Sequence, residues 1–287
     1  MFKDRAEAGL LLGEKVRDVL GRVTSDDSER SRGFPIPAQP DGPQPAHGPA
    51  LVVRVFAIPR GGVAVAAGVA RCLAAVFPNT ALDVIVVRKI GHPEAPELGL
   101  GAIAEGMRAE GSDAAGSEGP RFEGTSTAAS GAEGTDAEPV FDDELLSQVG
   151  LTRSDLGGVV ARERAELDRR MAVYHGGLRS SQPAEPGPPC DVAVVVDDGL
   201  ATGVTARAAL RAVRGRGVPR IVLAVPVAAQ QAVAAMEEEL AKAGTGEVVT
   251  LVTSRRFRSV GEWYADFGQL TDADVLTLLS RAGAAAP

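Results

Sequence analysis

The stretch "VVVDDGLATGVTARAAL", residues 194–210, predicts a buried strand, a tight turn and a helix in succession. The strand ends in two adjacent acids, Asp197 and Asp198, and small residues separate the acids from the helical run. Neighbouring carboxylates repel each other, and this repulsion is strongest where a buried strand keeps water away. We therefore expect a cation or a hydroxyl-rich ligand at this point of the fold.

Apolar, β-branched runs alternate with helical patterns on both sides of this stretch. The expected strands are 51–58, 82–88, 191–197, 221–227 and 247–254. The expected helices of the body are 63–76, 154–174, 204–214 and 228–242. Strands that are apolar on both faces and separated by helices indicate a parallel sheet covered on both sides. The predicted fold class is a doubly wound α/β domain with a mostly parallel five-stranded sheet, in which ligands bind at the carboxyl ends of the strands.

Two polar, low-complexity stretches divide the chain. They cannot bury enough apolar surface to offset the entropy lost on ordering, so we expect them to be disordered. The expected organisation is an amphipathic N-terminal helix over 1–22, a linker over 23–49 and a domain over 50–287. Within that domain we expect a disordered insertion at about 107–139 and a hood-like C-terminal segment at about 255–287.

The composition is that of an ordinary globular protein, with 45% hydrophobic and 24% charged residues among 287. A net charge of −8 argues against a general nucleic-acid or membrane-surface binder. No apolar run approaches the roughly 18 residues of a membrane span. Cys72 and Cys190 lie far apart and have no metal-ligand spacing, so free thiols and a cytoplasmic location are expected.

The loop "GLATGVT", residues 199–205, has the features of a phosphate-binding turn. Its glycines let the backbone turn tightly, the following helix N-terminus favours an anion, and Thr202 and Thr205 add hydroxyl donors. A Walker-type loop would need a lysine where Val204 stands, and the Asp-x-Asp-Gly-Thr order of phosphoaspartate hydrolases is absent. The alternative is that this loop has no ligand, and that a capped helix simply follows the strand with both acids exposed to solvent.

An apolar run, two acids, two spacers and then Ala-Thr-Gly-x-Thr resemble the signature of type I phosphoribosyltransferases. The resemblance implies that Asp197 and Asp198 hold the ribose hydroxyls of phosphoribosyl pyrophosphate (PRPP) and take part in catalysis. It implies a 5′-phosphate site made by Ala201, Thr202, Gly203, Val204 and Thr205.

Two other expected strand ends fit this resemblance. After the first strand comes "PRGG", residues 59–62, where the family holds pyrophosphate, often through a cis peptide; this implicates Arg60 and Gly61. The second strand ends in Arg88 and Lys89, where the family begins its mobile catalytic hood, and the glycine-rich stretch "IGHPEAPELGLGAIAEG" that follows, residues 90–106, is expected to act as a lid. Both basic residues are implied pyrophosphate contacts, and Lys89 is also an implied catalytic residue. A plain strand-to-helix turn is the alternative at 59–62.

The resemblance covers about residues 50–254. Within it the chain is more similar to a little-characterised bacterial phosphoribosyltransferase-like group. That group shares the segments "AIPRGG", "VRK", "ELGLGAIAEG" and a C-terminal segment of the "VGEWYADFGQ" type.

The implied reaction is displacement of pyrophosphate from the ribose by a nitrogen nucleophile, in nucleotide metabolism. The implied cofactor is Mg²⁺, bound through the substrate and to Asp197 and Asp198, which would offset their repulsion. The implied partners are PRPP and a small-molecule acceptor, and the family often forms homodimers.

The acceptor is left open by the sequence. Ala201 stands where the 6-oxopurine branch has an acidic base, which disfavours hypoxanthine or guanine as acceptor. Glu97 and Glu105 are weaker candidates for that base. Trp263 and Tyr264 either stack on an acceptor ring or pack the end of the chain.

Two further functions compete with the transferase. The same pocket could serve a non-catalytic PRPP sensor that a partner reads, although a sensor has less need of Arg60, Lys89 and a hood. A phosphatase-like enzyme with Asp197 as nucleophile is the third hypothesis. Pyrophosphate release with candidate acceptors separates the first two, and trapping of a phosphoaspartate would support the third.

Overall fold

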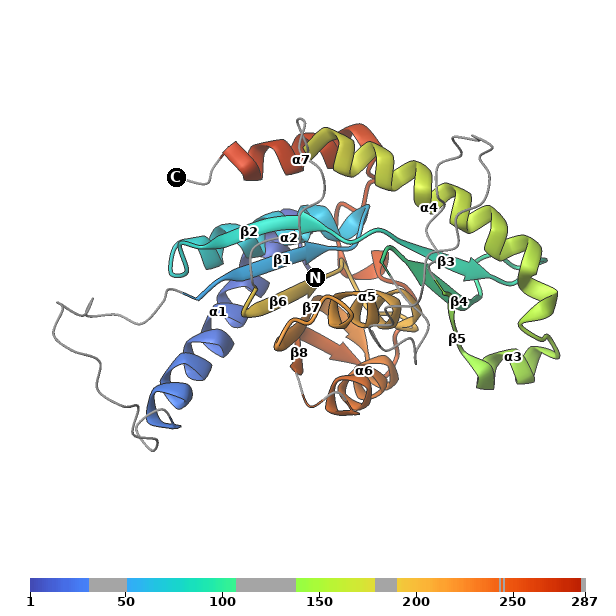
Figure 1. Cartoon of the computed structure of the whole chain (residues 1–287), viewed down its shortest axis with the longest axis horizontal. Helices are drawn as coiled ribbons and strands as arrows, with labels where there is room; N and C mark the ends of the chain where they lie inside the picture. Colours follow the sequence, from blue (N-terminus) through green and yellow to red (C-terminus); the bar gives the residue numbers. More distant parts are fainter. Residues whose placement is uncertain (31–50, 107–137, 179–189, 243, 245, 285–287) are drawn as a thin grey trace, which may run out of the picture.

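The computed structural model describes residues 1–30, 51–106, 138–178, 190–242, 244 and 246–284 (Figure 1). The predicted insertion at 107–139 lies almost wholly outside the described residues, as does most of the predicted linker. Helix α1, Arg5–Arg30, continues past residue 22 into the range predicted as linker.

A parallel sheet of five strands forms the body of the molecule. Its order is β2 (Thr80–Val84), β1 (Val53–Ala57), β6 (Val192–Val196), β7 (Arg220–Ala229) and β8 (Gly246–Ser254). All five residues of β6 are buried, because both faces of a central parallel strand are covered. The predicted doubly wound α/β fold is confirmed.

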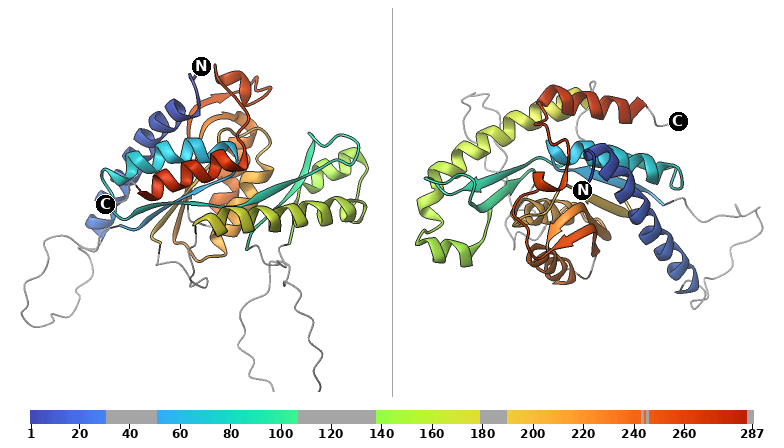
Figure 2. Two further views of the ribbon diagram at one scale, coloured as in Figure 1. Left: turned by 90° about the horizontal axis from the view of Figure 1, so that it is seen from above. Right: turned by 180° about the vertical axis from the view of Figure 1, so that it is seen from behind.

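Helices cover the two faces of this sheet (Figures 1 and 2). Helices α1, α2 (Gly61–Ala74) and α7 (Asp272–Ala284) lie on one face, and α1 packs along α2. Helices α5 (Val204–Arg214) and α6 (Gln230–Lys242) pack on β6, β7 and β8 from the other side. None of the described helices is long and apolar enough to cross a membrane.

A second, antiparallel sheet extends from one end of the parallel sheet. It consists of β3 (Val87–Gly91), β4 (Gly99–Ala104) and the short β5 (Val140–Phe141). Helix α4 (Gly157–Leu178) packs on β3 and β4, after the short helix α3 (Asp143–Val149) and the 3-10 turn η2 (Ser154–Leu156).

This second sheet corrects two predictions. The expected strand over 82–88 is two strands, because the chain leaves the parallel sheet after Val84 and re-pairs with β4 from Val87. The run from Val84 to Val87 is buried throughout, so no change in hydropathy marks the break. The glycine-rich stretch expected to act as a lid is strand β4, buried at every position. At Gly101 an added Cβ would lie 2.6 Å from the Val140 carbonyl oxygen, so this glycine serves close strand packing.

The C-terminal segment expected to be hood-like has two parts. Its first part contains the 3-10 turn η3 (Gly261–Trp263) and packs against the N-terminus of the chain. Its second part is α7, which packs on α2, α4 and β2. Thr271 and Asp274 cap this helix: each backbone N–H donates to the other's side chain, at 2.8 and 3.2 Å.

Candidate active site

The loops after β1 and β6 meet where the winding of the sheet reverses. From β1 the chain proceeds to β2 on one side, and from β6 it proceeds to β7 on the other. The Ile58 backbone N–H donates to the Val196 carbonyl at 2.8 Å, which joins the two loops. Ligands of doubly wound sheets bind at such a point. The sequence-predicted pairs, Arg60 with Gly61 and Asp197 with Asp198, therefore lie at one edge.

The acid pair is held by the backbone and by Tyr264. The Asp198 N–H donates to Asp197 Oδ1 at 2.8 Å, and the Tyr264 hydroxyl donates to the Asp198 carbonyl at 2.5 Å. Gly61 approaches from the β1–α2 loop so closely that an added Cβ would overlap Asp198 Oδ2. Only glycine fits here, which places the PRGG loop directly against the Asp198 carboxylate.

Arg5 is a member of this site that sequence reasoning did not identify. Its Nε donates to Asp198 Oδ2 at 2.8 Å, although the two residues are 193 positions apart. No motif marks Arg5 in the sequence, where it is one of several charged residues in an amphipathic helix. Its one distinguishing feature is its place in the first turn of α1. The sequence does not show where that turn packs, because its position depends on the tertiary fold.

Burial raises the pKa values of both acids. Desolvation raises the pKa of Asp197 well above its ordinary value, and the Asp198 charge raises it further. Desolvation also raises the pKa of Asp198, against the opposing effect of Arg5. The ionised carboxylates are therefore poorly stabilised by their surroundings, and a bound cation or a set of hydroxyl donors would stabilise them.

The predicted phosphate loop turns directly into α5. Gly203 has φ +81°, a left-handed conformation that favours glycine, and it precedes the helix. Backbone hydrogen bonds from Leu200 to Val227 and from Ala229 to Leu200, both 2.8 Å, anchor the loop on β7. Ala201 and Thr202 are exposed. The first-turn N–H groups of a helix lack intrahelical acceptors, so an exposed loop at this point can bind an anion.

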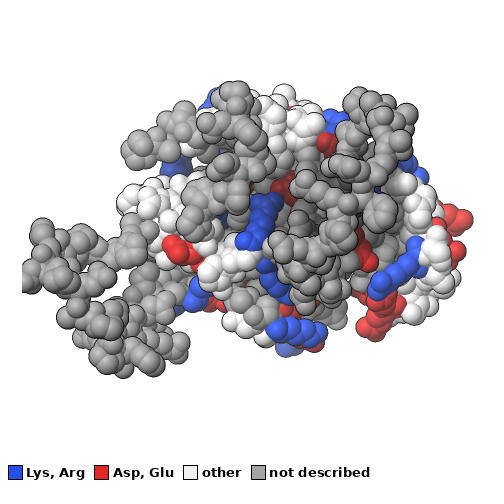
Figure 3. Space-filling view, in the orientation of Figure 1, with Lys and Arg blue, Asp and Glu red and all other residues white. Residues whose placement is uncertain are grey.

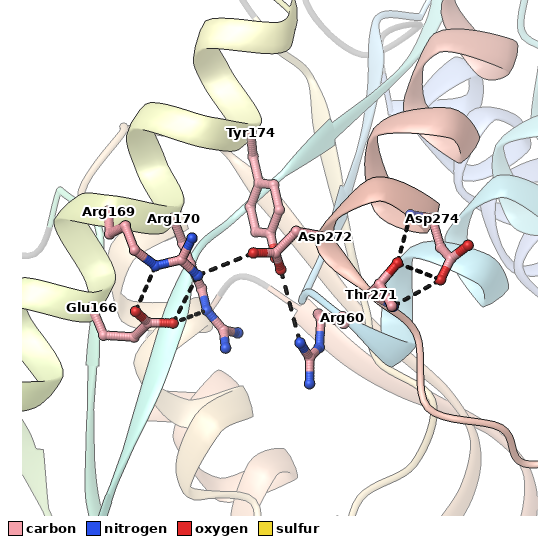
Figure 4. A network of polar contacts seen from close by, with 8 residues as sticks. All are labelled: Arg60, Glu166, Arg169, Arg170, Tyr174, Thr271, Asp272 and Asp274. Carbon is pink, nitrogen blue, oxygen red and sulfur yellow. Dashed lines mark hydrogen bonds and ion pairs between the residues drawn. The ribbon is translucent and has the colours of Figure 1, made fainter.

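Arg60 belongs to a polar network shared with α4 and α7 (Figure 4). The Pro59–Arg60 peptide is cis. The Arg60 guanidinium lies 3.9 Å from Asp272 Oδ1, whereas Tyr174 and Arg169 donate to the Asp272 carboxylate at 2.6 and 3.0 Å. Asp272 is thus fixed mainly from α4. Arg60 is the loosely held member, and it can turn toward a ligand at little cost.

The same network predicts a dependence of stability on pH. Hydrogen bonds from Arg169 and Arg170 lower the pKa of Glu166 from 4.5 to about 2. Because the pKa of Glu166 is lowered in the folded state, its ionised carboxylate contributes fully to the stability of the fold above pH 4.5. That stability is lost as the pH falls toward 2. Thermal unfolding followed by circular dichroism should therefore show a smaller loss of Tm over this range in Glu166→Gln than in the unaltered protein. Glu237→Gln, an exposed change on α6, should keep the full loss. Equal losses in both variants would contradict the assignment.

Arg88 and Lys89 lie inside the antiparallel strand β3, where alternate side chains point to opposite faces. Arg88 donates to Glu163 of α4 at 2.9 and 2.6 Å. Lys89 contacts Glu97, with its Nζ 3.2 Å from the carbonyl and 3.4 Å from the carboxylate. Their predicted role at pyrophosphate stays a prediction, and in this structure each contacts a carboxylate of its own.

Of the two roles left open for Tyr264, the structure supports packing. Its ring is buried and lies 5.5 Å from the Phe2 ring, and desolvation raises its pKa. Trp263 is half-buried and stacks on Phe257, with ring centroids 6.4 Å apart. Phe257 lines an open pocket of about 520 Å³ at the ends of β7 and β8. The other lining residues are Ala229, Gln230, Gln231, Ala234, Ser254 and Arg255.

The two candidate bases have different surroundings. Glu105 is buried, and it pairs with Arg216 and His175, each at 2.7 Å. This arrangement is that of a structural ion pair. Glu97 is fully exposed and contacts Lys89.

The described charges on the face drawn in Figure 3 are of both signs. On the described part of the face in Figure 3, basic and acidic side chains are interspersed. Across the α5–α6 contact, for example, Arg211 donates to Glu239 at 2.8 and 3.2 Å.

The fold and the site define the class of protein. A five-stranded parallel sheet, an acidic pair at its switch point and an adjoining antiparallel sheet correspond to the type I phosphoribosyltransferase fold. A crystal structure of TT1426 from Thermus thermophilus is similar, with a TM-score of 0.58, 32% identity and 98% coverage of both chains.

Curated relatives lead to the same conclusion. The chain is 31% identical over 283 residues to "Putative phosphoribosyl transferase Rv0571c" of Mycobacterium tuberculosis H37Rv, and equally to MT0597 of strain CDC 1551. The match takes in 98% of this chain but 47% of these relatives, so the chain spans about half their length. No family model matches the chain. The chain belongs to a phosphoribosyltransferase-like family.

Proposed function

We propose that this protein transfers a 5-phosphoribosyl group from PRPP to a nitrogen acceptor, a nucleobase or related small molecule, with release of pyrophosphate. The observation that carries the proposal is the placement of Asp198 against Gly61 at the switch point of the sheet. This contact joins the loop proposed to hold the ribose to the loop proposed to hold the pyrophosphate. Similarity to two proteins named "Putative phosphoribosyl transferase" supports it.

The donor would span three elements of the site. The 5′-phosphate would bind the loop 201–205 at the start of α5, and Asp197 and Asp198 would accept hydrogen bonds from the ribose hydroxyls. The pyrophosphate would bind the backbone at Gly61 and the guanidinium of Arg60, which leaves its long contact with Asp272. Lys89 is proposed as a further cation toward the pyrophosphate, after release from Glu97.

The acid pair also fits Mg²⁺ bound in part through the substrate. Mg²⁺ takes one or two carboxylates together with substrate oxygens and waters. Within the described residues no group of three His, Cys, Asp or Glu side chains could hold a metal by itself, so two carboxylates plus the substrate is the fitting donor set. Asp197 and Asp198 would hold the ion, which supplies positive charge to the pyrophosphate.

The chain's own contribution to catalysis is positioning and electrostatics. As the bond to pyrophosphate breaks, the ribose ring gains positive charge, and the carboxylates beside its hydroxyls stabilise that charge. The departing pyrophosphate gains negative charge, which Arg60 and the α2 N-terminus can stabilise. Fixing the donor between two rigid loops aligns it for attack by the acceptor.

Isothermal titration calorimetry with PRPP in magnesium buffer tests the proposal, followed by assays of pyrophosphate release across a panel of nucleobases and small amines. We expect saturable binding and release with at least one acceptor. Binding without release across a broad panel would identify a PRPP sensor instead. Absence of binding would overturn the proposed function.

A further inference from the structure

Two sets of contacts fix the start of α1 against the rest of the fold. On one side α1 lies close along α2 (Figure 2). An added Cβ at Gly9 would overlap the Val65 carbonyl oxygen, and one at Gly13 would lie 2.7 Å from Cys72 Cβ. On the other side the Phe2 N–H donates to the Trp263 carbonyl at 2.8 Å. The first turn of α1 is therefore held in register with both α2 and the C-terminal segment.

This first turn brings the Arg5 side chain into the acid site. Besides the bond from Nε to Asp198, its second guanidinium nitrogen donates to the Gly268 carbonyl at 2.8 Å. Its Cζ lies 3.8 Å from the centre of the Phe267 ring, a cation–π contact. The side chain is 11% exposed, and that of Asp198 is 16% exposed. Three different contacts, with Asp198, Gly268 and Phe267, thus set the direction of the guanidinium.

We propose that Arg5 is a positioning residue of the active site, which fixes the orientation of the Asp198 carboxylate toward the donor ribose. The inference rests on the proposed function and adds to it a group from the N-terminal helix. Within the described part of the chain Arg5 engages Asp198 Oδ2, while Oδ1 is the oxygen left to accept from a ligand. Gly61 packs against the same Oδ2 and Arg5 Nε, so the carboxylate has little room to rotate.

Arg5→Met removes the charge and keeps most of the side-chain length, and Arg5→Lys keeps the charge but not the two-pronged donor geometry. Loss of one partner from a desolvated, hydrogen-bonded charge pair is expected to lower kcat/KM for PRPP by about 10²-fold in Arg5→Met. Arg5→Lys should retain an intermediate activity. Arg17→Met is the matched control: it removes an arginine of the same helix that pairs with exposed Asp18 at the surface, and it should behave as the unaltered protein.

A double-mutant cycle with Asp198→Asn distinguishes positioning from a general structural role. If Arg5 acts through Asp198, Arg5→Met should add little to the loss in kcat/KM that Asp198→Asn already causes. Circular dichroism and Tm identify any variant that fails to fold, and Arg5→Lys then carries the test.

The outcomes separate this inference from the proposed function. PRPP binding by the unaltered protein together with unchanged kcat/KM in Arg5→Met would overturn the role of Arg5 alone. Additive losses in the double mutant would also overturn it, as would tighter PRPP binding by Arg5→Met, which would show that Arg5 competes with the ligand for the carboxylate. No binding by the unaltered protein would overturn the proposed function, and the inference with it.

Discussion

Asp198→Asn is expected to lower kcat for pyrophosphate release on the order of 10²-fold or more, with a smaller change in KM. Asparagine has the shape of aspartate and can still accept a hydrogen bond from a ribose hydroxyl, so ground-state binding is partly kept. It has no charge to stabilise the positive charge that develops on the ribose, and this interaction grows only as the bond to pyrophosphate breaks. Steady-state assays at saturating acceptor measure the two constants separately.

The matched control is Asp18→Asn, the same chemical change at an exposed position of α1 that pairs with Arg17. Its kinetics should equal those of the unaltered protein, because exposed ion pairs contribute little. A Tm measured for both variants shows whether loss of the Arg5–Asp198 pair has also destabilised the fold. Near-native kcat in a folded Asp198→Asn protein would count decisively against the proposed mechanism.

The sequence predicts the parallel sheet because each of its strands carries a local signal. Runs such as 192–196 are apolar throughout, and turn residues separate each run from a helical pattern. The loops that follow these strands are predictable for the same reason, since the carboxyl ends of parallel strands share an edge. The strand pattern alone is thus enough to place Gly61 and Asp198 at one site.

The antiparallel sheet and Arg5 are not predictable in this way. Burial of the run 84–87 is continuous across two sheets, so hydropathy cannot show where one strand ends and the next begins. The glycines of β4 indicate flexibility by composition, whereas an added Cβ at Gly101 would meet β5 and one at Gly99 would meet the Lys89 side chain of β3. Arg5 reaches Asp198 only because α1 folds back on α2 and the C-terminal segment, and contacts over such separations leave no periodic pattern in the sequence.

Gly61→Ala is expected to weaken PRPP binding by about 10²-fold, since a shift of about 1 Å in a positioning group can cost that much. Gly61 begins α2 and does not have a positive φ, so the backbone itself would accept alanine. The obstacle is steric: the new Cβ would overlap Asp198 Oδ2, lie 2.6 Å from its Cγ and lie 3.2 Å from Arg5 Nε. Either the carboxylate rotates away or the PRGG loop moves outward, and both changes separate the two halves of the proposed donor site. Calorimetry with PRPP in magnesium buffer measures the effect.

Gly158→Ala provides the control, because this glycine is exposed in the first turns of α4 and an added Cβ there would meet nothing within 4 Å. Alanine is a better helix former than glycine, so this variant should bind PRPP normally and gain roughly 0.5–1 kcal/mol in stability. The contrast tests the position and not the substitution, since the same methyl group is added to the start of a helix in both cases. If folded Gly61→Ala binds PRPP as tightly as Gly158→Ala does, the ribose does not lie between the PRGG loop and Asp198, and the donor site must be sought at another edge of the sheet.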